Sequence, residues 1–435
     1  MSLKSKTISG VKWSTVSTIT LAIVGLLKIS VLARFLDAGD FGLMALVTFV
    51  LGFMNLFMDM GLTSAILHKQ KISNDEYASL YWINIIFSFI LFALITSLSP
   101  LISNFYEEPD LIELIPLMAI SIMLSALGRQ FKTIEQKHLN FKYIAITDII
   151  GAVLGLGVGV VTAVQGYGVY ALVYAALTQY AISNTIYFIN GVKDRGMIFH
   201  FKYQETKPFL RIGIYQVGGQ VVNYFNRDLD ILLIGKFFGA EVLGGYDLAK
   251  QLVKRPMQIL NPIITKVASP VLSLSQKNKI ELKNKFLKLI NITATANFTA
   301  YAILAAAAYP VIYLVYGSEY TDITAIVQLL CVYMFLRSVL SPVGSLVIAT
   351  GKTKNEFYWN IFVLLISPLA IIVGAQFSAK IVALSLVIVT LILLIPAWRL
   401  LIYNLCGASM KRYFLSFIPR YYRLYLLLKD NTNKN

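Results

Sequence analysis

Charged and amide side chains recur at helical spacing within an otherwise apolar stretch, residues 242–266. Residues three and four apart share one face of a helix. Six polar residues follow that spacing: Asp247, Lys250, Gln251, Lys254, Gln258 and Asn261, with Arg255 beside them. Ammonium and guanidinium groups on such a face could bind a diphosphate or acidic sugars. The same face could instead pack two parts of the protein together, with local pairs such as Asp247 with Lys250. We predict substrate binding for Lys250, Lys254 and Arg255.

A second charged group, Arg227, Asp228 and Asp230, lies within the apolar stretch 208–235. The two aspartates have the spacing of a metal-binding pair, but side chains two residues apart on a helix diverge by about 200°. An ion pair of Arg227 with one aspartate, or coupling to substrate or ion movement, fits a helix better. We predict Arg227 as a substrate-binding cation, both aspartates as ion-coupling candidates, and no metal or cofactor.

Four isolated charges lie in other apolar stretches, where a charge costs several kcal/mol unless it is paired or hydrated. The bases are Lys28 and Arg337, which we predict to line a substrate cavity, although Lys28 could instead extend to the membrane interface. The acids are Asp59 and Asp148, which are candidates for coupling to H⁺ or Na⁺. Asp59 could instead cap the end of its helix.

The apolar stretches that carry these residues are long enough to cross a bilayer. The chain has 435 residues, 57% hydrophobic and 14% charged, with a mean hydropathy of +0.70, whereas soluble domains are roughly 25% charged. Each span needs roughly 20 apolar residues. We predict an all-α polytopic membrane protein of about twelve spans: 12–35, 41–65, 79–102, 111–127, 143–164, 169–190, 208–235, 242–266, 289–316, 323–349, 356–376 and 381–404. Gly151, Gly155 and Gly159 form a small-residue face suited to close helix packing.

The basic residues between these spans alternate between the two sides. One side receives 28 Lys and Arg residues and the other receives 3. Cytoplasmic loops carry the excess of basic residues, so we predict that both termini are cytoplasmic and that the protein lies in the inner (cytoplasmic) membrane. Most of the net charge of +16 then reflects orientation. We expect no nucleic-acid partner.

Two segments six spans apart resemble each other. Ala33–Gly42 and Gly235–Gly244 each contain a base followed by Phe and a Gly eight residues after the base, at an offset of 202 residues. Copies separated by six spans enter the membrane in the same direction, which predicts a pseudo-two-fold axis along the membrane normal. We therefore expect an N-terminal six-helix lobe at 1–200, a C-terminal six-helix lobe at 201–405 and a basic amphipathic cytoplasmic tail at 406–435.

Several short motifs also resemble a known family. They are Asn226–Asp230, Ile234–Lys236, Gly239, Leu243–Gly244 and Tyr246, Thr7–Trp13, Ala33–Leu36 with Asp40–Gly42, Asp59–Leu62 and Arg129–Lys132. Their order and spacing resemble the Wzx-type polysaccharide flippases, most closely the colanic acid exporter branch, of the multidrug/oligosaccharidyl-lipid/polysaccharide exporter superfamily. The resemblance covers about residues 1 to 405.

The resemblance implies two six-helix bundles that flip an undecaprenyl-diphosphate-linked oligosaccharide by alternating access, for lipopolysaccharide or exopolysaccharide biosynthesis. The expected partners are that lipid-linked oligosaccharide, membrane lipids, H⁺ or Na⁺, and the polymerase and glycosyltransferases of the same pathway. Many relatives have two further helices where this sequence has a short tail, which leaves the accommodation of the polyprenyl chain open.

Two other functions remain alternatives. A MATE-like cation-coupled exporter of small molecules would favour an acidic cavity, whereas the polar face at 242–266 is mainly basic. A membrane-embedded polysaccharide polymerase would need a large outer loop with catalytic Arg or His, but the predicted outer loops are short. We predict a transporter and not an enzyme.

Overall fold

A computed structural model describes residues 3–59, 63, 66–67, 69, 72–196 and 199–422. They form two compact units, Met1–Gly244 (unit 1) and Gly245–Asn435 (unit 2), each taken by itself below. Unit 1 contains α1 (Leu3–Leu32), α2 (Ala38–Asp59), α4 (Asn74–Tyr106), α5 (Leu111–Lys137), α6 (Phe141–Val164), α7 (Val169–Arg195) and the first part of α8 (Tyr203–Ser273). Unit 2 contains the rest of α8, α9 (Lys279–Ala306), α10 (Ala308–Val315), α11 (Thr324–Leu340), α12 (Pro342–Thr350), α13 (Thr353–Ala375), α14 (Ala379–Ala397), α15 (Asn404–Cys406) and α16 (Met410–Leu415).

These helices confirm the predicted all-α membrane fold. Within the described residues, nine helical stretches are long and apolar enough to cross a membrane. The more polar α7 and α8 are not among them, although α7 has 27 residues and α8 has 71. Some boundaries differ from the prediction: α5 continues to Lys137 instead of ending at 127. Pro342 begins a new helix within the expected span 323–349, because proline cannot donate the hydrogen bond that would continue α11.

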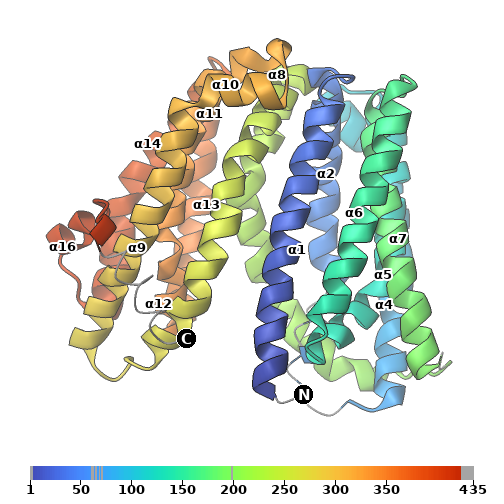
Figure 1. Ribbon diagram of the computed structural model, residues 1–435, viewed down its shortest axis with the longest axis horizontal. Coiled ribbons are helices and arrows are strands. Elements are labelled where there is room, and N and C mark those ends of the chain that lie inside the picture. Colours follow the sequence, from blue (N-terminus) through green and yellow to red (C-terminus); the bar gives the residue numbers. More distant parts are fainter. Residues whose placement is uncertain are drawn as a thin grey trace. The chain divides into compact units, whose positions relative to one another are not determined.

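Helices α5, α6 and α7 pack closely in unit 1 (Figure 1). The predicted glycine face of α6 makes this possible. A Cβ on Gly151 would lie 2.1 Å from Ser183 Oγ, and one on Gly155 would lie 2.5 Å from the carbonyl oxygen of Ala175, both on α7. The prediction that these glycines serve close packing is therefore confirmed. The short distance also lets side chains of α7 reach the backbone of α6.

A second close crossing in unit 1 joins the two similar segments found in the sequence. A Cβ on Gly42 would lie 1.8 Å from the carbonyl oxygen of Ala240, and one on Gly244 would lie 1.7 Å from that of Ala38. Ala240 and Gly244 are the counterparts of Ala38 and Gly42 at the offset of 202. The two contacts are therefore reciprocal: each glycine lies against the backbone of the other copy's alanine.

Acidic residues after α4 hold the neighbouring kink in α8. Gly239 at the kink has a positive φ of 77°, a conformation that costs little only for glycine. Glu108 Oε1 accepts a hydrogen bond of 2.9 Å from the backbone N–H of Ala240. Lys236 Nζ lies 2.9 Å from Glu107 Oε1, and this hydrogen bond and charge lower the pKa of Glu107.

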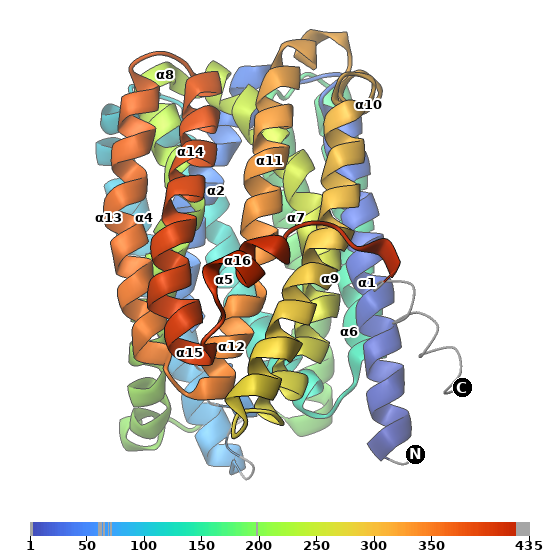
Figure 2. The same cartoon turned by 90° about the vertical axis from the view of Figure 1, so that its left-hand side faces the viewer.

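In unit 2, α9 and α12 and the segment Leu401–Ala408 contribute most of an apolar core. The chain turns at Gly407 and then lies back on α9, as Figure 2 shows for α16 and the segment after it. Tyr413 of α16 is fully buried in this core. The described part of the tail therefore packs against the protein through its aromatic residues.

Candidate functional site

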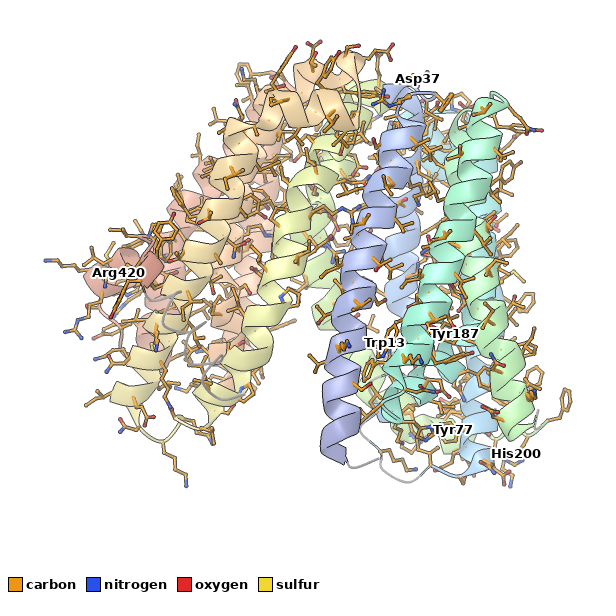
Figure 3. The ribbon with its side chains drawn as sticks, viewed as in Figure 1. Trp13, Asp37, Tyr77, Tyr187, His200 and Arg420 are labelled. Carbon is orange, nitrogen blue, oxygen red and sulfur yellow. The ribbon has the colours of Figure 1, made fainter. Side chains whose placement is uncertain are left out.

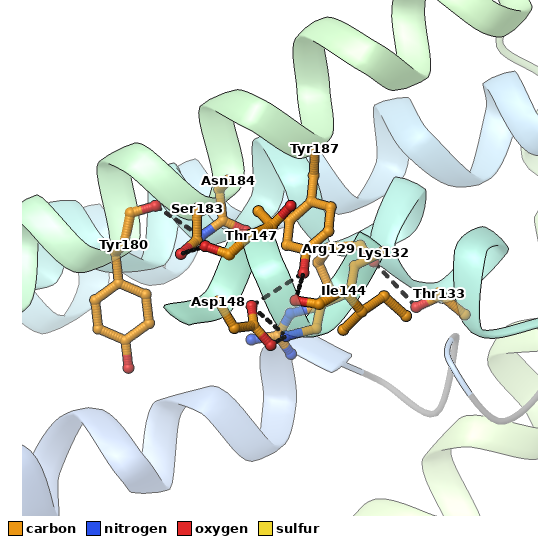
Figure 4. A network of polar contacts seen from close by, with 10 residues as sticks. All are labelled: Arg129, Lys132, Thr133, Ile144, Thr147, Asp148, Tyr180, Ser183, Asn184 and Tyr187. Carbon is orange, nitrogen blue, oxygen red and sulfur yellow. Dashed lines mark hydrogen bonds and ion pairs between the residues drawn. The ribbon is translucent and has the colours of Figure 1, made fainter. Parts of the chain in front are cut away.

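A network of polar contacts lies among the helices of unit 1 (Figure 4). Lys132 Nζ on α5 lies 2.8 and 3.0 Å from the two carboxylate oxygens of Asp148 on α6. The hydroxyl oxygen of Tyr187 on α7 lies 3.0 Å from Asp148 Oδ1 and 3.2 Å from the carbonyl oxygen of Ile144. The ring of Tyr187 also lies under the ammonium group, with Nζ 5.5 Å from its centroid. The charge of Asp148 is thus neutralised by a lysine and further hydrogen-bonded by a phenol.

Beside the network lies a cavity of about 410 Å³. All of its lining residues except Leu21 carry a hydroxyl, amide or charged group; they are Leu21, Thr63, Ser125, Arg129, Lys132, Thr133, Gln136, Asp148, Gln179, Tyr180, Ser183, Asn184 and Tyr187. Arg129 is held in part by the side-chain oxygen of Asn55, 3.2 Å from its guanidinium group. The cavity offers one guanidinium, one compensated ammonium group, and many donors and acceptors suited to sugar hydroxyls and phosphate oxygens.

The helices position these groups through short side chains at their contacts. On α5, Ser125, Arg129, Lys132 and Gln136 are spaced by four, three and four residues and so share one face. Another glycine on α5, Gly128, brings that helix against α7, since its Cβ would lie 2.6 Å from the Cα of Asn184. The glycine face of α6 does the same at Ser183 and Ala175 of α7. The cavity is consequently lined by α5, α6 and α7 at close range, with Leu21 of α1 adding an apolar side chain.

Of the predicted ion-coupling residues, Asp148 lies at this cavity. The side chain of Asp59 lies outside the described residues. On α8, Asp228 and Asp230 are both buried. Arg227 Nε lies 2.6 Å from Asp228 Oδ2, so the predicted internal pairing of Arg227 with a neighbouring aspartate is confirmed.

The predicted substrate-binding cations lie elsewhere. Within the described part of the chain, none of them lines the cavity of Arg129. In unit 1, Lys28 on α1 is half-buried and the side chain of Arg227 is 54% exposed. The structure adds Arg129 and Lys132, which the predicted span boundaries at 127 and 143 leave in a basic loop. The spacing of four, three and four from Ser125 to Gln136 was the available signal that the helix continues through them.

The other predicted cations lie in unit 2. Lys250 is fully buried, whereas Lys254 and Arg255 are half-buried. The buried Nε of Arg255 has no hydrogen-bond partner within the described residues. Arg337 on α11 donates to the hydroxyl oxygen of Tyr333 over 3.1 Å. These four bases are therefore held at least partly within the protein.

Amide side chains complete the polar face of α8 in unit 2. Gln251 Nε2 donates to Asp247 Oδ2 over 2.6 Å. Further along, Asn297 of α9 donates to the side-chain oxygen of Asn261 over 3.1 Å. The two ends of the predicted polar face are thus engaged in contacts inside the protein.

Helices arranged in this way are found in solved membrane transporters. The fold matches "Lipid II flippase MurJ, inward closed conformation" with a TM-score of 0.76 and 17% sequence identity, covering 98% of this chain and 93% of that one. It also matches an inward-facing multidrug resistance MATE family transporter of the MOP superfamily with a TM-score of 0.67 and 16% identity, covering 91% of this chain and 100% of that one. At these identities the likeness concerns the fold alone.

The sequence gives the narrower assignment. A family model described as "Polysaccharide biosynthesis protein" matches residues 31–325. The chain is 32% identical to "Lipopolysaccharide biosynthesis protein WzxC" of Escherichia coli (strain K12), over 98% of this chain and 87% of the relative. It is 28% identical to "Teichuronic acid biosynthesis protein TuaB" of Bacillus subtilis (strain 168), over 86% of this chain and 78% of the relative. The chain belongs to this polysaccharide biosynthesis family of multi-pass membrane proteins, and the expected resemblance to Wzx-type flippases is confirmed.

Proposed function

We propose that this protein moves a polyprenyl-diphosphate-linked oligosaccharide across the cytoplasmic membrane by alternating access, for the synthesis of a cell-surface polysaccharide. The observation that carries the proposal is the polar cavity of about 410 Å³ held between helices of a membrane transporter fold. Polar groups at membrane depth are costly and mark substrate paths. Moving a lipid between leaflets makes and breaks no covalent bond, so no catalytic residue or cofactor is needed.

In this proposal Arg129 binds a phosphate oxygen of the headgroup, while the amides and hydroxyls around it bind sugar hydroxyls. A guanidinium group suits this role because it stays charged and can donate two parallel hydrogen bonds. Lys28 and Arg227 of unit 1 would contact the same substrate at other stages of transport. The four bases of unit 2, Lys250, Lys254, Arg255 and Arg337, would do so as well.

Coupling to H⁺ or Na⁺ is proposed for Asp59, Asp148, Asp228 and Asp230. The contacts of Asp148 refine its role. Proton uptake there would leave the ammonium group of Lys132 uncompensated, so the pair would respond to an ion as a unit. The polymerase and glycosyltransferases of the pathway remain proposed partners.

The reciprocal glycine contacts support the proposed symmetry. A two-fold axis makes contacts reciprocal: where one residue touches a second, the counterpart of the first touches the counterpart of the second. Gly42 with Ala240, and Gly244 with Ala38, have this form. We infer that α7 and both arms of α8 also cross the membrane and bring the number of spans to twelve. We further infer lobes at 1–200 and 201–405, a tail at 406–435, and both termini in the cytoplasm.

A transport assay with an Arg129→Gln variant tests the proposal. We expect flipping of a polyprenyl-diphosphate oligosaccharide in proteoliposomes, followed by lectin accessibility, to slow at least about tenfold, in line with the loss of a charged hydrogen bond. Lys193→Gln removes an exposed cation from α7 and serves as the matched control. Wild-type flipping by Arg129→Gln, or an equal loss in the control, contradicts the role of Arg129.

The cations of unit 2 are tested in cells. Lys254→Ala and Arg337→Ala should each abolish glycan export while membrane insertion, checked by fractionation, is retained. If Lys254→Ala, Arg337→Ala and Arg129→Gln, each tested separately, all export glycan normally, the proposed function itself is contradicted.

A further inference from the structure

The chain after α14 is anchored along α9 by buried polar contacts. The fully buried amide of Asn291 donates to the carbonyl oxygens of Ser416 and Ile418, over 3.0 and 2.7 Å. One turn of helix further along, the backbone N–H of Arg420 donates to Thr295 Oγ1 over 2.9 Å. These contacts fix the backbone from 416 to 420 along α9.

Between this segment and α9 lies a cavity of about 640 Å³, lined by Asn284, Leu287, Lys288, Arg412, Leu415, Ser416, Arg420 and Tyr422. Three of these residues are cations: Lys288 from α9, and Arg412 and Arg420 from the returning segment. Arg420 lies at the periphery of unit 2 in Figure 3. None of the residues that line the cavity, as far as the chain is described, is acidic. By contrast Lys285, three residues before Lys288, is paired with Glu281 at 2.6 Å.

The cavity lies where α9 changes from charged to apolar. Lys279, Lys283, Lys285 and Lys288 fall in the first ten residues of the helix, whereas residues 289–306 contain no charged side chain. Such a boundary marks the depth at which lipid headgroups meet hydrocarbon, where basic and aromatic side chains gather. The exposed apolar side chains of Leu415 and Ile418 lie on the same returning segment.

We propose that this cavity binds the phosphate group of an anionic membrane phospholipid, in the leaflet at the N-terminal end of α9. Three cations converging from two segments neutralise the headgroup, and its acyl chains lie against the exposed apolar side chains of the returning segment. This lipid is distinct from the transported one, because the cavity is lined by α9 and the returning segment and by none of the residues assigned above to the transported substrate. The inference therefore stands or falls independently of the proposed transport function.

The test measures binding of fluorescent short-chain phosphatidylglycerol to the purified full-length protein in neutral detergent, against phosphatidylcholine of the same chain length. Each cation at a membrane surface changes anionic lipid affinity by about fivefold. A Lys288→Gln/Arg412→Gln/Arg420→Gln variant should thus lose most of the preference for phosphatidylglycerol. The control, Lys277→Gln/Lys279→Gln/Lys283→Gln, removes three charges from the same end of the unit without touching the cavity and should keep it.

Two further arms identify the ligand and exclude misfolding. Unlabelled phosphatidylglycerol should displace the probe, whereas inorganic phosphate at the same concentration should not. A Lys288→Arg/Arg412→Lys/Arg420→Lys variant keeps the charges and should retain binding. Displacement by inorganic phosphate to the same extent, equal loss in the control, or wild-type preference in the glutamine variant would each overturn the proposal.

Discussion

The two cavities use their positive charges in different ways. In unit 1, Lys132 is matched by Asp148 and covered by Tyr187, and the group lies among the helices. In unit 2, Lys288, Arg412 and Arg420 line an exposed cavity whose described residues include no carboxylate. A charge held among helices needs a partner within the protein, whereas a charge at the surface can be left for a ligand. The first arrangement should therefore contribute to folding, and the second should contribute to binding.

The largest expected effect comes from breaking the pair in unit 1. Asp148→Asn leaves Lys132 without its carboxylate. Breaking a buried pair costs about 3–5 kcal/mol; since these side chains are 33% and 19% exposed, we expect a loss of about 2 kcal/mol. Thermal unfolding in detergent measures it. A Lys132→Leu/Asp148→Leu variant should recover most of that stability. If it is as unstable as Asp148→Asn, the neutralising role of the pair is wrong.

A smaller effect should follow from releasing the returning segment of unit 2. Asn291→Leu keeps the side-chain volume but removes the hydrogen bonds to Ser416 and Ile418, at a cost of about 1.5 kcal/mol. Trypsin should then cleave at Arg412 and Arg420 faster than in the wild type. The control is Asn404→Leu, whose exposed amide donates, in the described structure, only to the carbonyl oxygen of Leu400 in the preceding turn. Unchanged cleavage of the Asn291 variant would show that the segment is held in another way.

Tyr187→Phe should have a weaker effect than either. It removes the phenolic hydrogen bond near Asp148 but leaves the ion pair and the aromatic ring, so we expect a loss of about 1 kcal/mol in thermal unfolding. Tyr174→Phe on the same helix should change stability less. A loss as large as that of Asp148→Asn would mean that the phenol, and not Lys132, is the main partner of the carboxylate.

The smallest effect on stability is expected at the cavity of unit 2, where no carboxylate is found among the described lining residues. Replacing Lys288, Arg412 and Arg420 by Gln together should change unfolding by no more than about 0.5 kcal/mol, as is usual for surface substitutions. Calorimetry of the variant and the wild type in lipid-free neutral detergent measures the difference. A loss of several kcal/mol would remove the contrast between the two cavities.

The sequence was sufficient for features that depend on pattern along one helix. It predicted the all-α membrane fold, the glycine face of α6 and the pairing of Arg227 with a neighbouring aspartate, and the structure contains all three. It did not locate the polar cavity. Arg129 and Lys132 follow an apolar stretch, where a basic helix end and a basic loop have the same composition. The spacing from Ser125 to Gln136 favours a helix, and packing against α7, through contacts such as Gly128 with Asn184, establishes it.

Features that join distant segments were harder still. Asp148 was a reasonable site residue, but its partner lies on another helix and no local pattern names it. The aromatic residues of the tail predicted an apolar face without saying what covers that face. In the structure, Tyr413 is buried in the core of unit 2, because the buried amide of Asn291 offers the returning backbone hydrogen bonds that lipid does not.

The reciprocal contacts of Gly42 and Gly244 bear on how such a chain can change over time. In a symmetric pair of identical chains, one substitution would enter both sides of the axis at once. In a single chain the two glycines are encoded separately, so they are free to mutate one at a time. Yet a side chain on either one collides with the backbone of the other copy. The two halves can therefore diverge in most places but must keep this crossing in common.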